Sequence, residues 1–396
     1  MHIDETLIPS ISQRIGNRLN ELKASHKQFD VHCHIFNYDY IPDKYFGIRL
    51  PFIINEKFLK FAEELLDEAW PFSDDDPLSH VAWFLRYART KTMGEIADDL
   101  AIYYPPNTAF CPLMMDLWPG IGGKMLRPFE DQMTEMESIV DRNPETMFPF
   151  LAIDPNVGAE KVKERFMRGF SEGGKFWGVK IYPGLGYKPS HKILMEIFRV
   201  CEARQIPVTT HCGDGTVHTT RKLMLQRYMT YRNNRLKRTA DLKFMLFKKQ
   251  YGNYFNAPEN WEPVLRTYPN LKLNLAHFGF DDHWEKYMKG ESDTWVHRIL
   301  DLMQRYKNVY TDLAFVMRLS SNNNYPFMDT LRHLYETNSN VHNKLLYGTD
   351  FYMVTSREKI QHLIDDFTQK AGAPFMHQIS HSNALKFLFE DSETTG

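Results

Sequence analysis

Two histidines at alternate positions are the first residues whose spacing could do chemistry. His32 and His34 lie in segment 28–36, in which apolar residues predominate. In a β-strand their Cα atoms would lie about 6.5–7 Å apart with both imidazoles on one face, so both could bind one metal ion. The same pattern also occurs in strands whose histidines face solvent or form hydrogen bonds in the core. The pair alone leaves both interpretations open.

Polar residues also occur within or at the end of five later apolar segments. They are Lys180, His211, His277, Asp312 and Asp350. Neutral imidazoles and a carboxylate are suitable ligands for a divalent ion such as zinc, and a further coordination position can be left for water. These residues can act together only if the fold brings the ends of their segments to one place.

An alternation of strand-like and helix-like segments predicts such a fold. Strands are predicted at 28–36, 109–115, 148–155, 177–182, 206–211, 271–277, 308–312 and 344–350, with helix-like stretches between them. This alternation favours an α/β fold, a parallel (β/α)8 TIM-like barrel, over an open sheet. The carboxyl ends of the strands then surround one mouth, into which the two histidines and the five later polar residues would point.

Three segments do not belong to the regular barrel. A leading helix is predicted within 1–27, a helical insertion at about 37–106 after the first strand, and a basic insertion at 221–249 between the fifth and sixth strands. We nevertheless expect residues 1–396 to form a single barrel domain, because no short internal repeat or low-complexity tract interrupts the pattern.

Composition limits the class of partner. The 396 residues are 43% hydrophobic and 25% charged, with a formal net charge of -2, so neither nucleic acid nor a membrane surface is an expected partner. No stretch of about eighteen apolar residues and no secretory signal pattern occurs, which predicts a cytoplasmic protein with a small-molecule substrate and leaves a homodimer open. The four cysteines contain no C-x-x-C pair and are expected to be reduced.

Taken together, these motifs resemble those of the amidohydrolase superfamily, which consists of metal-dependent hydrolases with a distorted barrel fold. The resemblance is carried by Asp30-Val31-His32-Cys33-His34, Gly178-Val179-Lys180, His211, His277, Gly348-Thr349-Asp350 and Ser382-Asn383-Ala384-Leu385. It looks closest to the amidohydrolase-related branch that includes aminocarboxymuconate semialdehyde decarboxylase and related decarboxylases, lactonases and hydratases.

The resemblance implies a ligand set and a reaction class. The implied metal ligands are His32, His34, His211 and Asp350. Asp350 would also accept and return a proton, and His277 would polarise a substrate carbonyl or stabilise an oxyanion. One zinc ion is expected, with manganese or a second ion as alternatives. The expected reaction is hydrolysis of an ester, lactone or amide bond of a small, carboxylated substrate by metal-activated water.

Two other functions stay open from the sequence. One is non-oxidative decarboxylation of an aromatic or unsaturated carboxylate on the same metal site. The other is a non-catalytic barrel that binds a ligand, although the complete ligand set argues against it.

Substrate binding is predicted for three residues, namely Lys180, Tyr182 and Arg221. A lysine inside a barrel must find an anion, lose its charge or become carbamylated. A substrate carboxylate or a structural acid is the expected partner of Lys180. The basic stretch that begins at Arg221 could attract an anionic substrate or form a solvated helical face, and its aromatic content is too modest to favour nucleic acid.

Overall fold

The computed structural model describes residues 1–25, 27–43, 87–213, 217, 219, 249–321, 326–353 and 357–391. Most of the insertion predicted at 37–106 lies outside these described residues. The same holds for the basic stretch predicted at 221–249, except Lys249, and therefore for Arg221. The predictions for these two segments stay predictions.

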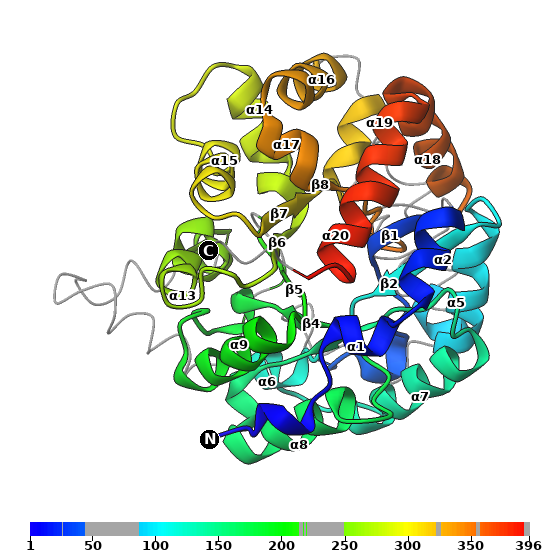
Figure 1. Cartoon of the computed structure of the whole chain (residues 1–396), viewed down its shortest axis with the longest axis vertical. Helices are drawn as coiled ribbons and strands as arrows, with labels where there is room; N and C mark the ends of the chain where they lie inside the picture. Colours follow the sequence, from blue (N-terminus) through cyan, green and yellow to red (C-terminus); the bar gives the residue numbers. More distant parts are fainter. Residues whose placement is uncertain are drawn as a thin grey trace, which may run out of the picture.

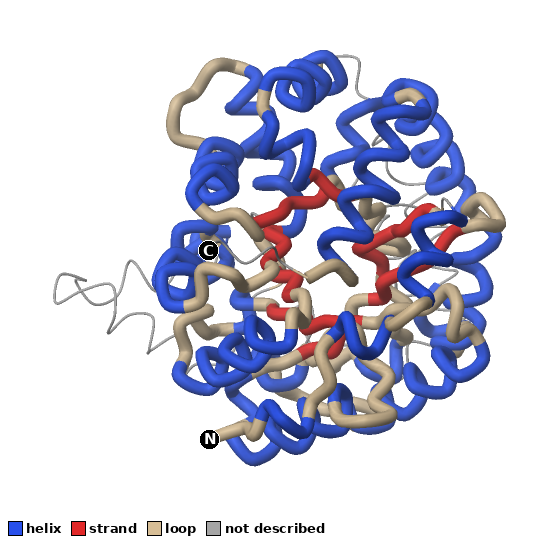
Figure 2. Tube along the Cα trace, viewed as in Figure 1, coloured by secondary structure: helices blue, strands red, loops and turns tan. Residues whose placement is uncertain are grey.

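Parallel strands form the centre of the described fold (Figure 2). They are β1 (Gln28–Cys33), β2 (Thr108–Pro112), β3 (Phe150–Ala152), β4 (Gly178–Ile181), β5 (Val208–Thr210), β6 (Leu273–Leu275), β7 (Val309–Asp312) and β8 (Leu345–Leu346). β1 pairs with β2, and β3 to β8 pair in sequence order. Single bridges join Leu113 to Phe150 and Cys33 to Phe351. Pairing therefore continues from β2 to β3 and from the end of β8 back to β1.

Helices surround these strands (Figure 1). Before β5 they are α1 (Ile11–Ile15), α2 (Arg18–Ser25), α5 (Met93–Ile102), α6 (Trp118–Ile121), α7 (Phe129–Arg142), α8 (Ala159–Phe170) and α9 (Lys192–Arg204). After β5 they are α12 (Lys249–Asn256), α13 (Glu262–Thr267), α14 (Phe280–Met288), α15 (Trp295–Arg305), α16 (Phe327–Thr337), α17 (Ser339–Lys344), α18 (Arg357–Ala371), α19 (Ala373–His377) and α20 (Asn383–Leu388). α8 illustrates their packing, because Val162, Phe166 and Phe170 recur every four residues and are fully buried.

The strands are short and buried on both faces, as expected where helices cover a parallel sheet. Every residue of β2 to β8 is buried. At the amino-terminal end of the ring, Phe387 of α20 stacks on Phe150 of β3 with ring centroids 6.3 Å apart, and its centroid lies 5.1 Å from that of Tyr310 of β7. α20 therefore fills this end of the ring with aromatic side chains.

The predicted barrel is confirmed in the described residues. Each observed strand overlaps its predicted segment and is shorter, because the predicted segments also include loop residues next to the strand. The single-domain organisation stays a prediction. No helix in the described ranges is both long enough and apolar enough to cross a membrane.

Candidate metal centre

Side chains from the first and last strands meet at the carboxyl-terminal end of the ring. His32 lies in β1, His34 follows β1, and Asp350 follows β8. Asp350 Oδ1 lies 3.2 Å from His34 Nε2 and 3.4 Å from His32 Nε2. All three residues are buried, and their ligand atoms lie within 4.8 Å of one another, close enough to bind one metal ion.

Hydrogen bonds to the other ring nitrogen hold both histidines in place. His32 Nδ1 donates to Asp312 Oδ2 over 3.0 Å, and His34 Nδ1 donates to the carbonyl oxygen of Leu113 over 2.9 Å. A neutral imidazole carries one proton, so each ring then presents an unprotonated Nε2 on the side of Asp350. An acceptor behind each ring is typical of metal-binding histidines.

The chemistry of these donors fits a divalent cation. His32 Nε2 is buried and forms no hydrogen bond, which costs about 1–3 kcal/mol unless a ligand satisfies the nitrogen. Burial lowers the pKa of His32, so the ring is neutral at pH 7, as a metal ligand must be. Burial alone would raise the pKa of Asp350, but its contact with His34 and the nearby His32 hold that pKa below its usual range. Two imidazoles and a carboxylate suit zinc or manganese.

Close approach of β8 to β1 brings the ligands together. A Cβ on Gly348 would lie 2.7 Å from the Cβ of His32, so the position requires glycine. Asp30 ties the same strands from within the core. It accepts hydrogen bonds from Thr349 Oγ1 over 2.6 Å and from the hydroxyl of Tyr104 over 2.5 Å.

His277 and His211 form a second pair beside this cluster. His277 Nδ1 donates to the carbonyl oxygen of Ala314 over 3.1 Å, so its Nε2 accepts from His211 Nδ1 over 3.0 Å. Burial and the nearby His32 lower the pKa of His277 to about 4. Burial and His277 lower the pKa of His211 well below its usual value. Both rings are therefore neutral at pH 7, and Nε2 is the unprotonated nitrogen of His211.

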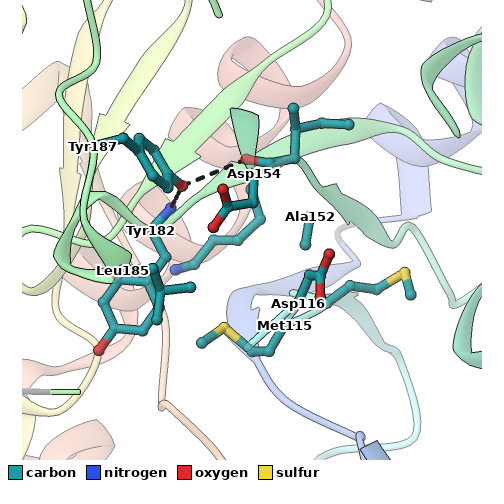
Figure 3. A pocket seen from close by; sticks show the side chains of 10 residues that line it. Met115, Asp116, Ala152, Asp154, Tyr182, Leu185 and Tyr187 are labelled. Atoms are coloured by element: carbon teal, nitrogen blue, oxygen red, sulfur yellow. Dashed lines mark hydrogen bonds between the residues drawn. The ribbon is translucent and has the colours of Figure 1, made fainter. Parts of the chain in front are cut away.

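A small pocket, with a cavity volume of about 10 Å³, adjoins these residues and is lined by Lys180 and Tyr182 (Figure 3). The ring centroid of Tyr182 lies 4.2 Å from that of His211. Lys180 is 2% exposed and has no hydrogen-bond partner among the described residues. Burial lowers its pKa to about 8, although Asp312 and Asp350 lie close enough to oppose this shift. A buried ammonium without a partner favours an anionic ligand.

Several predicted site residues thus lie close together. The cluster contains His32, His34 and Asp350, His277 lies beside it, and the pocket contains Lys180 and Tyr182. His211 contacts His277 rather than the cluster, and its role as a metal ligand stays a prediction.

Asp116 and Asp154 also line the pocket but are not among the predicted site residues. Asp154 follows β3 as His211 follows β5, so the same strand-end signal marks it in the sequence. Asp312 ends β7, and its role in orienting His32 appears only from the contact between the two side chains.

Comparisons with known proteins agree with this fold. Residues 257–389 match the family model described as amidohydrolase. The predicted resemblance to the amidohydrolase superfamily is confirmed. No protein of curated function matches this chain by sequence.

Three solved structures share the barrel fold of this chain. An uncharacterised TIM-barrel protein from Bordetella bronchiseptica is 13% identical, with a TM-score of 0.51 over 91% of this chain and 98% of that one. 5-Carboxyvanillate decarboxylase from Novosphingobium aromaticivorans DSM 12444, solved with manganese and 4-hydroxy-3-methoxy-5-nitrobenzoic acid, is 10% identical, with a TM-score of 0.51 over 98% and 99% of the two chains. 2,6-Dihydroxybenzoate decarboxylase, solved with 2,6-dihydroxybenzoate, is 11% identical, with a TM-score of 0.50 over 91% and 99%. At these identities the likeness shows the fold.

Replacing Asp312 with Ala should weaken binding of a divalent ion by about 10–100-fold, because His32 loses the acceptor that orients its ring. Competition between the protein and a chelating dye for Zn2+ would measure the change. Asp312→Asn is the matched control, since the amide oxygen can still accept from His32 Nδ1, and it should lose less affinity. Equal affinities for wild type and Asp312→Ala would contradict this role of Asp312.

Proposed function

We propose that this chain is a metal-dependent hydrolase that cleaves an ester, lactone or amide bond of a small carboxylated substrate. One observation carries the proposal, namely the buried cluster of His32, His34 and Asp350 with an orienting acceptor behind each histidine. Zinc is the proposed ion and manganese the alternative. His211 is the proposed fourth ligand. When bound, such an ion lowers the pKa of water towards about 7 and polarises a substrate oxygen.

Asp350 is the residue that we propose moves the proton. Its carboxylate is ionised at neutral pH because its pKa lies below the usual range. Oδ1 lies 3.4 Å from His32 Nε2 and 3.2 Å from His34 Nε2, so the three atoms face one point. A water molecule beside Oδ1 can lose a proton to it, and the leaving group can then take that proton from the same oxygen.

His277 has a related role in the proposal. In its neutral form Nδ1–H is bonded to Ala314, so Nε2 accepts a proton rather than donating one. Once Nε2 takes a proton and its hydrogen bond from His211 is broken, the positive ring can donate a hydrogen bond to a negative oxygen that develops on the substrate. The predicted oxyanion role of His277 therefore requires the protonated ring.

Lys180 is the proposed binding residue for the carboxylate of the substrate. The residue lies in the pocket wall with Tyr182, and burial lowers its pKa to about 8, so it is mostly charged at pH 7. The described residues place no anion in hydrogen-bonding contact with Lys180. A substrate carboxylate would supply one.

Decarboxylation on the same site is the second candidate. The unpaired Lys180 favours it, because a buried ammonium can hold a carboxylate beside the bond that breaks. Two solved structures of similar fold are decarboxylases of aromatic carboxylates. In this reaction the electron pair of the carbon–carboxylate bond stays on carbon, carbon dioxide leaves, and a protonated His277 would supply the replacing proton.

Product analysis with the metal-loaded protein separates the two reactions. A panel should contain aromatic carboxylates labelled in the carboxyl carbon, together with carboxylated esters, lactones and amides. Hydrolysis releases one acid equivalent per bond and no labelled carbon dioxide. Release of the label would identify decarboxylation. Binding without turnover across the panel would contradict both reactions and favour a binding barrel.

A further inference from the structure

The pocket wall contains a buried carboxyl oxygen that the described residues do not satisfy. Asp154 is 2% exposed, and its Oδ2 forms no hydrogen bond. The other oxygen, Oδ1, accepts from the backbone N–H and from the side-chain amide of Asn156, both over 2.8 Å. Oδ1 therefore caps the short helix that follows β3, while Oδ2 takes no part in the cap. A buried polar atom of this kind normally has a partner, from the protein, a water molecule or a ligand.

Strand register places this oxygen on the pocket side. Ala152 of β3 pairs with Lys180 of β4, and residues two apart in a strand share a face. Asp154 lies two residues after Ala152, and Tyr182 lies two residues after Lys180. Both therefore lie one layer nearer the mouth of the barrel than the Ala152–Lys180 pair. Figure 3 shows the Asp154 carboxyl facing the space between Tyr182 and Asp116.

Neighbouring polar groups of the pocket already have partners. Asp116 Oδ2 accepts from Arg165 Nη1 over 2.7 Å. The hydroxyl of Tyr187 accepts from the backbone N–H of Tyr182 over 2.9 Å and donates to a backbone carbonyl. Asp154 Oδ2 and Lys180 Nζ thus share one pocket, and neither has a hydrogen-bond partner in the described ranges.

We propose that Asp154 is a specificity-determining residue, whose Oδ2 forms a hydrogen bond with an oxygen of the substrate while Lys180 binds its carboxylate. This inference rests on the proposed function and adds one requirement, namely a hydroxyl or carbonyl oxygen of the substrate that reaches Asp154 Oδ2 while the carboxylate is bound at Lys180. Burial and the charge of Asp116 raise the pKa of Asp154 to about 8. The carboxyl is then protonated at neutral pH, and Oδ2–H donates. The charged and titratable groups around it are Asp116, Arg165, Lys180 and Tyr187.

Two variants separate a substrate contact from the capping role. Asp154→Asn keeps an oxygen for the cap and places an N–H donor at the second position. Asp154→Ser keeps a good helix-capping oxygen but removes the second polar atom. Both should match wild type in bound zinc and should unfold cooperatively at pH 6, so any change in ligand binding reports on Oδ2. Lys180→Met tests the carboxylate subsite separately.

The probes are benzoate and its 2-, 3- and 4-hydroxy isomers, titrated calorimetrically into zinc-loaded protein at pH 6.5. We expect one hydroxy isomer to bind wild type about tenfold more tightly than benzoate. Asp154→Asn should keep this preference, and Asp154→Ser should abolish it.

The inference is overturned if Asp154→Ser retains the preference or if no isomer is preferred. Lys180→Met should weaken all four acids equally, and if it changes none of them, the carboxylate site of the proposed function fails instead. Absence of binding by all four acids would contradict both.

Discussion

Asp350→Asn is expected to reduce kcat by about 10²–10⁴-fold, because an amide cannot accept the proton that the carboxylate takes at Oδ1. The substitution keeps the size of a buried side chain that contacts His32 and His34. Thermal unfolding should therefore change little compared with the loss of turnover. Steady-state kinetics on the substrate identified by product analysis would measure the effect.

Asp329 supplies the control for this substitution. It is exposed in the first turn of α16, far in sequence from the cluster residues, so Asp329→Asn should keep wild-type turnover. A turnover rate for Asp350→Asn close to that of wild type would contradict the proposed role of Asp350.

Asp154→Asn is expected to become more stable than wild type as the pH rises towards 8. The pKa of Asp154 is raised from 3.8 in the unfolded chain to about 8 in the folded protein, through burial and the nearby Asp116. The folded state therefore binds more protons than the unfolded state between these two values. Its stabilising contribution is complete below about pH 4 and is lost as the pH rises to about 8, at a slope of about 1.4 kcal/mol per pH unit. The amide does not titrate, so the variant lacks this loss.

Urea unfolding of wild type and Asp154→Asn at several pH values would measure the difference in free energy of unfolding. The difference should grow in favour of the variant between pH 5 and pH 8. A constant difference, or one that grows in favour of wild type, would show that Asp154 is ionised in the folded protein.

Asp116 offers a contrasting control from the same pocket. Its carboxylate forms a buried ion pair with Arg165, whose Nη1 lies 2.7 Å away. Removing one partner of a buried pair typically costs about 3–5 kcal/mol, and the cost should be lower here because Arg165 keeps Glu130 as a partner, 2.8 Å from Nη2. Asp116→Asn should therefore destabilise the protein at pH 7, although the substitution is chemically the same as at Asp154.

The strands could be predicted from sequence because both of their faces are buried. Each strand is therefore a short run of mainly apolar residues rather than an alternation of apolar and polar ones. The segment 206–211 and strand β5 at Val208–Thr210 show how closely run and strand agree. The ends could not be predicted to the residue, because pairing stops where the backbone turns, as after β6, where His277 adopts a φ value of 71°. Local composition does not show where such a turn begins.

The proximity of His32, His34 and Asp350 could be predicted because they lie at or just beyond the ends of strands that a barrel must bring to one mouth. Pairwise contacts could not be predicted in this way. Contact between Asp312 and His32 joins β7 to β1 over 3.0 Å, and contact between His211 and His277 depends on side-chain rotation at two strand ends. Sequence position gives the layer of a residue in the barrel, whereas the direction of its polar atoms depends on neighbours from other strands.

The most direct test of this account is the metal content of the purified protein after loading with Zn2+ and removal of excess ion. We expect one equivalent of zinc in wild type, as measured by elemental analysis, and a sharp loss in His34→Ala. His333→Ala removes an exposed histidine of α16 and should retain the wild-type content. The same zinc content in all three proteins, or none in wild type, would contradict a metal centre built on His32, His34 and Asp350.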